Sequence, residues 1–340
     1  MATLEVFQVI IQGLDNLLIY TRQKDLTTQW IALLLIRAIA TARYNISGIR
    51  SGSAIGYWQE SFGLGMKSHD WEARDYALKA SNRIFMQILD QVRSSLGSPE
   101  EKNTHVKSLQ ALADSACSLH FNERPLRLPL ASYYSSVGRQ DIAKGFLEHE
   151  MRTAISLLSD DYPENDKEGY TKIAQILTHI HDDFNALSAW SLCGPNERFN
   201  EDGGIQTQDA EESRPEHNIA SPKLEATPIA QPAEPMYRSC DGLCDKELTF
   251  ADSLWFCKVC NDVQFENQCL QKLRDGTLPF YVCSPNHDFL HVPSWVDEYQ
   301  ATGKGRVRVG GELIDGRRVG DSIVPVEQWL DTIKKDWNIG

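Results

Sequence analysis

The chain has 340 residues, of which 41% are hydrophobic, and its formal net charge is −13 at pH 7. This length predicts two or three domains with at least one buried core. The acidic balance argues against a nucleic-acid-binding protein, because such proteins usually display a basic face.

The N-terminal segment does not have the pattern of a secretory signal, since Glu5, Gln8 and Asp15 interrupt its apolar positions. The most apolar window, 30–40, is short and contains Arg37, so we expect no membrane-spanning helix and no membrane partner. We therefore expect a cytoplasmic or possibly nuclear protein whose thiols stay reduced.

Residues 1–196 are expected to be helical, because apolar side chains recur there every three or four positions. The predicted helices cover 7–18, 30–42, 71–92, 98–119, 140–158, 165–177 and 182–192. The helix from 98 has a full start signal in Ser98-Pro99-Glu100-Glu101. Short successive helices predict a mainly α fold built as an array of helical hairpins. Small and aromatic residues at 138–154 resemble degenerate tetratricopeptide (TPR-like) units, although no clean 34-residue period is present. A plain helical bundle is the alternative.

Residues 197–236 have a different composition, in which acidic side chains outnumber basic ones nine to three. Such a segment buries too little apolar surface to offset its ordering entropy. We expect a disordered acidic linker that tethers the C-terminal part loosely to the helices.

Residues 237–340 contain the most informative pattern, a concentration of six cysteines between 240 and 283 followed by two histidines. Their spacing is Cys-x3-Cys, Cys-x2-Cys, a single Cys and then Cys-x3-His-x3-His. Thiolates and imidazoles at such spacings suit tetrahedral Zn²⁺, and a segment this small needs metal to fold. We expect one or two structural zinc ions in a small α+β module. The candidate ligands are Cys240, Cys244, Cys257, Cys260, Cys269, Cys283, His287 and His291.

The end of the chain is expected to complete this module. Residues 306–309 predict a strand that enters a turn, and Asp315-Gly316 marks a second turn. A last helix from Pro325 has an apolar face at Trp329, Leu330, Ile333 and Trp337, which we expect to cover the zinc module.

Residues 240–291 resemble a ZZ-type zinc finger. The resemblance is carried by Cys240-Asp241-Gly242-Leu243-Cys244, by the strand and ligand pair at 254–260, and by Cys269 as the last cysteine before a helix. It implies a cross-brace in which Cys240, Cys244 and Cys269 belong to one zinc site. Cys257, Cys260 and His287 belong to the other, with Cys283 or His291 as the fourth ligand. The three-residue spacing of Cys283 to His287 suits one compact turn and favours Cys283, whereas the family's histidine pair favours His291.

One position departs from the family pattern, because Glu266 stands where a fifth cysteine is expected. Three outcomes are open for the first site: zinc held by three thiolates and Glu266, zinc held by three thiolates and a water, or no zinc. A carboxylate can ligate zinc, but thiolates dominate structural sites.

The resemblance also implies a function for Asp241 and Asp262, since acidic residues at these places in ZZ fingers hold the free amine of a peptide. A carboxylate pair suits an ammonium group. In the alternative interpretation both aspartates only orient zinc ligands.

More of the chain, including 165–192, 307–311 and 324–330, resembles the C-terminal portion of fungal NACHT- or tetratricopeptide-containing regulatory proteins. No G-x-x-x-x-G-K-[ST] phosphate loop is present in the sequence, so the ATPase activity of those proteins is not expected. We expect a non-enzymatic zinc-binding protein that recognises a peptide or protein partner, possibly through a free or basic N-terminus. The alternatives are a RING-like ubiquitin ligase component or a degenerate module with purely structural zinc.

Overall fold

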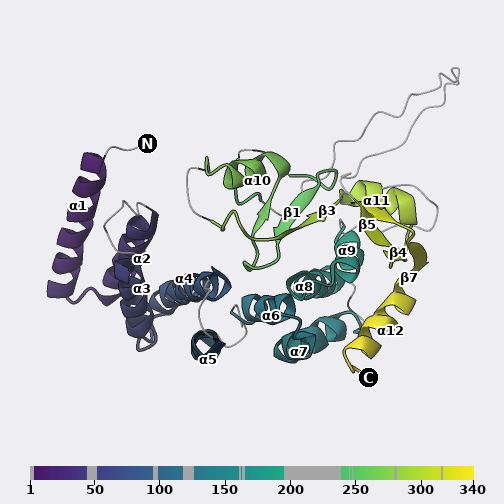
Figure 1. Cartoon of the computed structure of the whole chain (residues 1–340), viewed down its shortest axis with the longest axis horizontal. Helices are drawn as coiled ribbons and strands as arrows, with labels where there is room; N and C mark the ends of the chain where they lie inside the picture. The colour runs from purple at the N-terminus through teal and green to yellow at the C-terminus, as the bar shows by residue number, and fades with distance from the viewer. Residues whose placement is uncertain are drawn as a thin grey trace, which may run out of the picture.

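The computed structural model describes residues 4–43, 52–94, 99–117, 126–160, 162, 165–194, 239–244, 246, 248–278, 282–314 and 317–340. The predicted linker 197–236, the capping residue Ser98 and the turn Asp315-Gly316 lie outside these residues. The described part is mainly helical, with small sheets in its C-terminal third (Figure 1). None of its helices combines the length and hydropathy needed to cross a membrane.

Nine helices make up the N-terminal part that the structure describes. They are α1 (Leu4–Gln23), α2 (Thr27–Arg43), α3 (Gly52–Gly65), α4 (Trp71–Ser94), α5 (Pro99–Cys117), α6 (Arg127–Ser136), α7 (Gln140–Leu157), α8 (Asp166–His179) and α9 (Asp183–Ser191). Successive helices pack against each other, and α2 also contacts α4 as α6 contacts α8. This arrangement confirms the predicted helical array.

Two of these helices, α3 and α6, were not predicted from the sequence. Helix α3 contains Gly56 and Gly63, and α6 is a ten-residue helix with Pro129 near its start. Glycine and proline lower helix propensity, so neither segment has a strong pattern of its own. Tertiary packing holds them: Ala54 and Trp58 of α3 are buried against α2 and α4, and Leu130 of α6 is fully buried.

The described residues of the C-terminal part form three small antiparallel sheets and three helices. Its elements are β1 (Leu254–Cys257), β2 (Gln264–Phe265), α10 (Asn267–Arg274), β3 (Phe289–Val292), α11 (Trp295–Thr302), β4 (Arg306–Val309), β5 (Glu312–Ile314), β6 (Arg317–Val319), β7 (Ser322–Pro325) and α12 (Val326–Asp336). Strand β1 lies between β2 and β3, whereas β4 pairs with β7 and β5 with β6. The predicted α+β module is therefore present.

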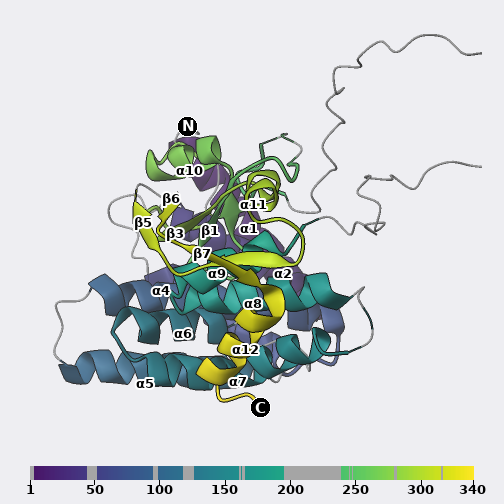
Figure 2. The same ribbon diagram turned by 90° about the vertical axis from the view of Figure 1, so that its right-hand side faces the viewer.

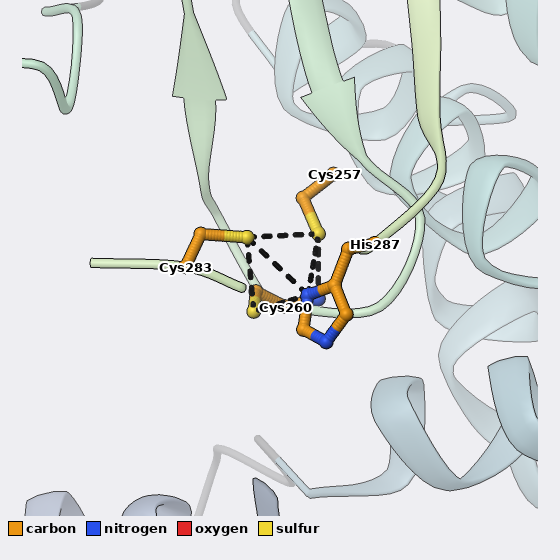
Figure 3. Close-up of side chains that lie close together, drawn as sticks. All are labelled: Cys257, Cys260, Cys283 and His287. Atoms are coloured by element: carbon orange, nitrogen blue, oxygen red, sulfur yellow. Dashed lines mark hydrogen bonds between the residues drawn. The ribbon is translucent and has the colours of Figure 1, made fainter. Parts of the chain in front are cut away.

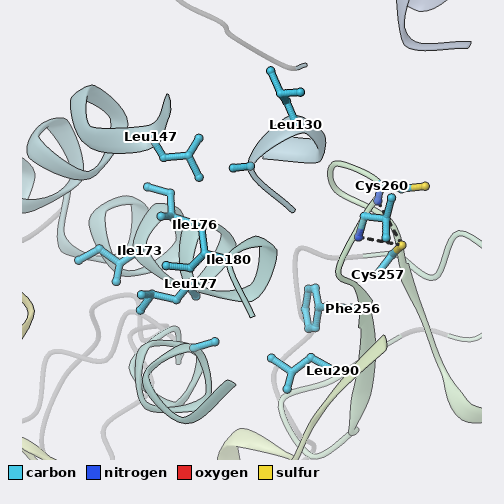
Figure 4. Close-up of a cluster of buried hydrophobic side chains, with 14 of the residues drawn as sticks. Leu130, Leu147, Ile173, Ile176, Leu177, Ile180, Phe256, Cys257, Cys260 and Leu290 are labelled. Atoms are coloured by element: carbon cyan, nitrogen blue, oxygen red, sulfur yellow. Dashed lines mark hydrogen bonds between the residues drawn. The ribbon is translucent and has the colours of Figure 1, made fainter. Parts of the chain in front are cut away.

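The β1–β3 sheet rests on α6, α8 and α9, as both views show (Figures 1 and 2). One hydrophobic cluster runs from Leu147 and Ile176 in the helices to Phe256 and Leu290 in the sheet (Figure 4). The rings of Trp190 and Phe256 stack with their centroids 4.1 Å apart. Because the two parts share this core, the described residues of the module are packed on the helices. The expectation that the module is only loosely tethered to the helices is therefore wrong.

The last helix, α12, packs both on strands β4 and β7 and on the helical array, whereas we had expected it to cover the metal-binding part of the module. Trp329 donates a hydrogen bond from Nε1 to Oδ1 of Asn185 on α9, over 3.0 Å. Lys144 on α7 lies over the ring of Trp337, 5.4 Å from its centroid. Strand β4 contacts both α9 and α12, and β7 contacts α12. These strands thus place the apolar face of α12 beside the helices.

Candidate metal centre

Four candidate ligands converge at one point beside β1, and all four are buried: Cys257, Cys260, Cys283 and His287 (Figure 3). Nδ1 of His287 lies 3.3, 3.4 and 3.5 Å from the Sγ atoms of Cys283, Cys260 and Cys257. The Sγ atom of Cys283 lies 3.7 Å from that of Cys260 and 3.5 Å from that of Cys257.

These separations match the edges of a zinc tetrahedron. Zn–S and Zn–N bonds of about 2.3 and 2.0 Å give edges of roughly 3.8 Å between two sulfurs and 3.6 Å between sulfur and nitrogen. The donor set of three thiols and one imidazole is also typical of structural zinc. We call these four residues the four-ligand group, and this group could hold a metal ion.

Local backbone geometry holds the first two thiols of this group. The backbone N–H groups of Val259 and Cys260 point at Sγ of Cys257, over 3.4 and 3.2 Å. Such bonds stabilise a thiolate. The pair Cys257 and Cys260 thus forms a tight loop directly after β1, whose pairing with β2 and β3 fixes its position.

The thiols of the four-ligand group oppose each other's ionisation, because each thiolate would stand next to the others. Burial raises the pKa of Cys257, but hydrogen bonds from Cys260, Cys283 and His287 lower it well below its ordinary value. The hydrogen bond between Cys260 and Cys257 is the largest of the causes that raise the pKa of Cys260 to about 11. The hydrogen bond between Cys283 and Cys257 is likewise the largest cause that raises the pKa of Cys283. One thiolate therefore disfavours the next, and a bound divalent cation would remove this conflict.

A carboxylate from the helical array stands behind the imidazole. Oδ1 of Asp90, on α4, lies 3.5 Å from Nε2 of His287, whose side chain is only 3% exposed. Burial lowers the pKa of His287, but Asp90 and the neighbouring thiols raise it to about 11. A carboxylate in this position fixes which imidazole nitrogen faces the metal. Sequence reasoning missed Asp90, because nothing in its local pattern distinguishes it from a solvent-exposed helix residue.

A second group consists of three thiols, Cys240, Cys244 and Cys269, whose Sγ atoms lie within 4.8 Å of one another. We call it the three-thiol group, and it could also hold a metal ion. The N–H groups of Gly242 and Glu266 each lie 3.3 Å from Sγ of Cys240. A Cβ atom on Gly242 would overlap Cβ and Sγ of Cys269, so only glycine fits at this position between Cys240 and Cys269.

Glu266 does not join the three-thiol group among the described residues. It occupies the N-cap of α10, where its Oε1 accepts the backbone N–H of Cys269 over 2.8 Å. Burial raises the pKa of Glu266, but N–H groups of this helix start lower it below its ordinary value. The resemblance had implied that Cys269 precedes the helix, but Cys269 lies inside the first turn of α10.

His291 lies apart from both groups. It sits on β3 opposite Trp255 in the β1–β3 register, and the two rings are 4.5 Å apart. Of the two candidates for the fourth position, the structure brings Cys283 to the metal centre and leaves His291 in the sheet.

The two aspartates expected to bind a peptide amine are both engaged within the chain. Oδ2 of Asp241 accepts the backbone N–H of Gln264 over 2.8 Å, and Asp262 accepts a short hydrogen bond from Nε2 of Gln175 on α8. Burial raises the pKa of Asp241, the hydrogen bond from the backbone of Gln264 lowers it, and the negative charge of Asp262 raises it by a smaller amount. Asp262 also lines a pocket of about 240 Å³ between the sheet and α8.

Comparison with protein families, with curated proteins and with solved structures gives no match to this chain. Its class therefore rests on its own geometry: an array of helical hairpins that carries a small α+β module with two cysteine-rich groups able to hold metal ions.

Proposed function

We propose that this chain is a zinc-binding interaction protein in which zinc has a structural function. The observation that carries the proposal is the tetrahedral arrangement of Cys257, Cys260, Cys283 and His287. Four protein ligands fill the coordination sphere of zinc, and a catalytic zinc usually keeps one position for water or substrate. The burial of all four residues supports the same interpretation.

The three-thiol group would bind zinc more weakly, because three thiolates leave one position to water or to a residue outside the described part of the chain. Zinc analysis of the full chain, with stepwise removal by a chelator, tests both groups. We expect one tightly held ion and one that is released earlier.

Substitutions at position 266 separate the two groups. Glu266→Cys places a fourth thiol beside Sγ of Cys240, so it should slow the early release. Glu266→Ser is the matched control, because serine also caps a helix but binds zinc poorly. Equal release from both variants would show that position 266 cannot supply a fourth ligand to the three-thiol group.

The partner in this proposal is a peptide or protein with a free or basic N-terminus, as in the ZZ-type zinc fingers that residues 240–291 resemble. Support comes from Asp241 and Asp262, two carboxylates close enough for one to raise the pKa of the other. An ammonium group would relieve this repulsion. Titration of the zinc-loaded full chain with one basic peptide, N-acetylated or free, tests it, with Asp241→Asn as the test variant and Asp331→Asn on α12 as control.

A purely structural module is the second candidate, and the hydrogen bond between Gln175 and Asp262 favours it. That bond already uses Asp262 to seat the module on α8. Equal binding of the free and acetylated peptides, or no binding of either, would support this candidate over peptide recognition.

A further inference from the structure

A pocket of about 350 Å³ lies where the helical array, the β1–β3 sheet and the C-terminal strands meet. It is separate from the two metal groups and does not include either aspartate of the proposed amine site. Residues from α8, α9, β1, β3, α11, β4 and β6 contribute to its wall. Pockets of this size take small molecules, and they commonly form at the junction of structural units.

Aromatic side chains form much of the wall of this pocket. Trp190 stacks on Phe256 at 4.1 Å, and Trp295 meets Phe250 edge-on with centroids 6.0 Å apart. Trp190, Phe250 and Phe256 are at least nine-tenths buried, so the rings are held in place. Fixed rings of this kind offer flat apolar surfaces to a planar ligand.

Most of the charged groups around the pocket are already neutralised. Arg308 lies 3.4 Å from Glu298 and 3.2 Å from Asp321. Asp252 is bound by Lys246 at 2.6 Å and by Thr249. Arg308 with Glu298 and Asp321 leaves one excess negative charge, and Asp252 is balanced by Lys246.

Arg318 differs from them. Its guanidinium donates to the carbonyl oxygens of Arg308 and Phe184, over 2.6 and 2.5 Å. Among the ion pairs of the described residues, none includes Arg318. A guanidinium has five N–H donors in a rigid fork, and carbonyl oxygens leave its charge in place. Glu298 and Asp321 act on this charge from beyond ion-pair distance. Lys167, which lies over the Phe250 ring, adds a further positive charge at the same wall, so the groups named around the pocket carry one net positive charge in sum.

We propose that this pocket binds a small anion, with its carboxylate or phosphate at Arg318 and a flat apolar body between the aromatic rings. A cationic ligand would also suit aromatic walls, but Arg318 and Lys167 would repel it. This anion site is independent of the proposed amine site, because it consists of other residues and would bind a ligand of the opposite charge.

Four probes with one ring system test the proposal on the zinc-loaded full chain: 2-naphthoate, 2-naphthyl phosphate, neutral 2-naphthylmethanol and trimethyl(2-naphthyl)ammonium. Calorimetry should show saturable 1:1 binding of at least one anion, about tenfold or more tighter than the alcohol. The better anion identifies the head group as carboxylate or phosphate. The proposal is overturned if neither anion saturates, if the alcohol binds equally well, or if the ammonium binds best.

Two variants assign the binding to this pocket. Arg318→Met should weaken anion binding at least about tenfold and leave binding of the alcohol nearly unchanged. Arg306→Met is the matched control, because Arg306 is exposed on the neighbouring strand and also donates to a backbone carbonyl. Equal binding by Arg318→Met and the wild type would refute the assignment.

Arg318 also anchors its strand to α9, so Arg318→Met could unfold this region. Ser191→Phe provides a test that keeps the arginine, because Ser191 is a half-buried residue at the end of α9 that lines the pocket. A phenyl ring there should fill the pocket and abolish binding of both the anion and the alcohol without a large loss in melting temperature. Unchanged anion binding in this variant would overturn the proposal.

Discussion

Oδ1 of Asp90 and Nε2 of His287 lie 3.5 Å apart, although 196 positions separate these residues in the sequence. Asp90 belongs to α4 of the helical array, and His287 belongs to the four-ligand group. A residue of the helices therefore stands beside the candidate metal centre, and a metal ion bound there would couple its binding to the docking of the module on the helices.

Replacing Asp90 with asparagine should weaken zinc binding at the four-ligand group by about 10- to 100-fold. Asparagine has a similar shape, but its amide oxygen is a weaker acceptor than a carboxylate for the Nε2–H of the imidazole and fixes the ring less strongly. Competition with a chromophoric chelator measures the change. Asp75→Asn is the control, since Asp75 lies on the same helix and pairs only with Lys79 at the surface in the ion pairs described. Equal affinities for the two variants would rule out this function for Asp90.

Alanine substitutions distinguish the two residues that sequence spacing alone offered as fourth ligand. Cys283→Ala should lose the tightly held zinc and lower the melting temperature, because three ligands remain in a buried group. His291→Ala should keep the zinc, since only the packing against Trp255 is lost. Zinc content after dialysis is the measurement. Loss of zinc from His291→Ala, with zinc retained in Cys283→Ala, would reverse the assignment.

Local signals account for what the sequence could predict. The long amphipathic helices have strong apolar stripes, and the pair Cys257 and Cys260 has a spacing that few structures other than a metal site explain. For the fourth ligand, the spacing of Cys283 to His287 favours Cys283, whereas the histidine pair of the ZZ-type fingers favours His291, so the two signals disagree. Only the pairing of β1 with β3 decides between them, by placing His291 opposite Trp255.

The seating of the module on the helices could not be predicted for a similar reason. Lys258 forms a 2.6 Å ion pair with Asp183, and the turn at 179–183 between α8 and α9 is partly buried. Each contact joins residues that are far apart in the chain. A single sequence contains periodicity and spacing, but it does not show which apolar face meets which.

Gly242 is predicted to be essential for the three-thiol group. In Gly242→Ala the new methyl group meets Cβ and Sγ of Cys269, so the loop at Cys240 must move away from α10. We expect a destabilisation of about 1–3 kcal/mol and earlier release of the weakly held zinc in a chelator titration. Gly145→Ala on α7 is the control, because no atom lies within 4 Å of its Cβ position. That change should be neutral or stabilise by up to ~1 kcal/mol. Unchanged zinc release in Gly242→Ala would contradict the geometry.

His181 should make the stability of the protein depend on pH between about 7 and 5. Burial, and next the charge of Lys258, lower its pKa below the ordinary value of 6.5. As the pH falls through 6.5, the unfolded chain binds a proton that the folded chain does not, so the free energy of unfolding decreases. His181→Asn should reduce this slope, and asparagine tolerates the positive φ of 61° at this position. Chemical denaturation at several pH values, with the exposed His149→Gln as control, measures the effect. Protonation of zinc ligands also weakens the protein in acid, but it does so in all three proteins, and the difference in slope therefore belongs to His181. Parallel curves for His181→Asn and the wild type would show that the buried imidazole does not contribute.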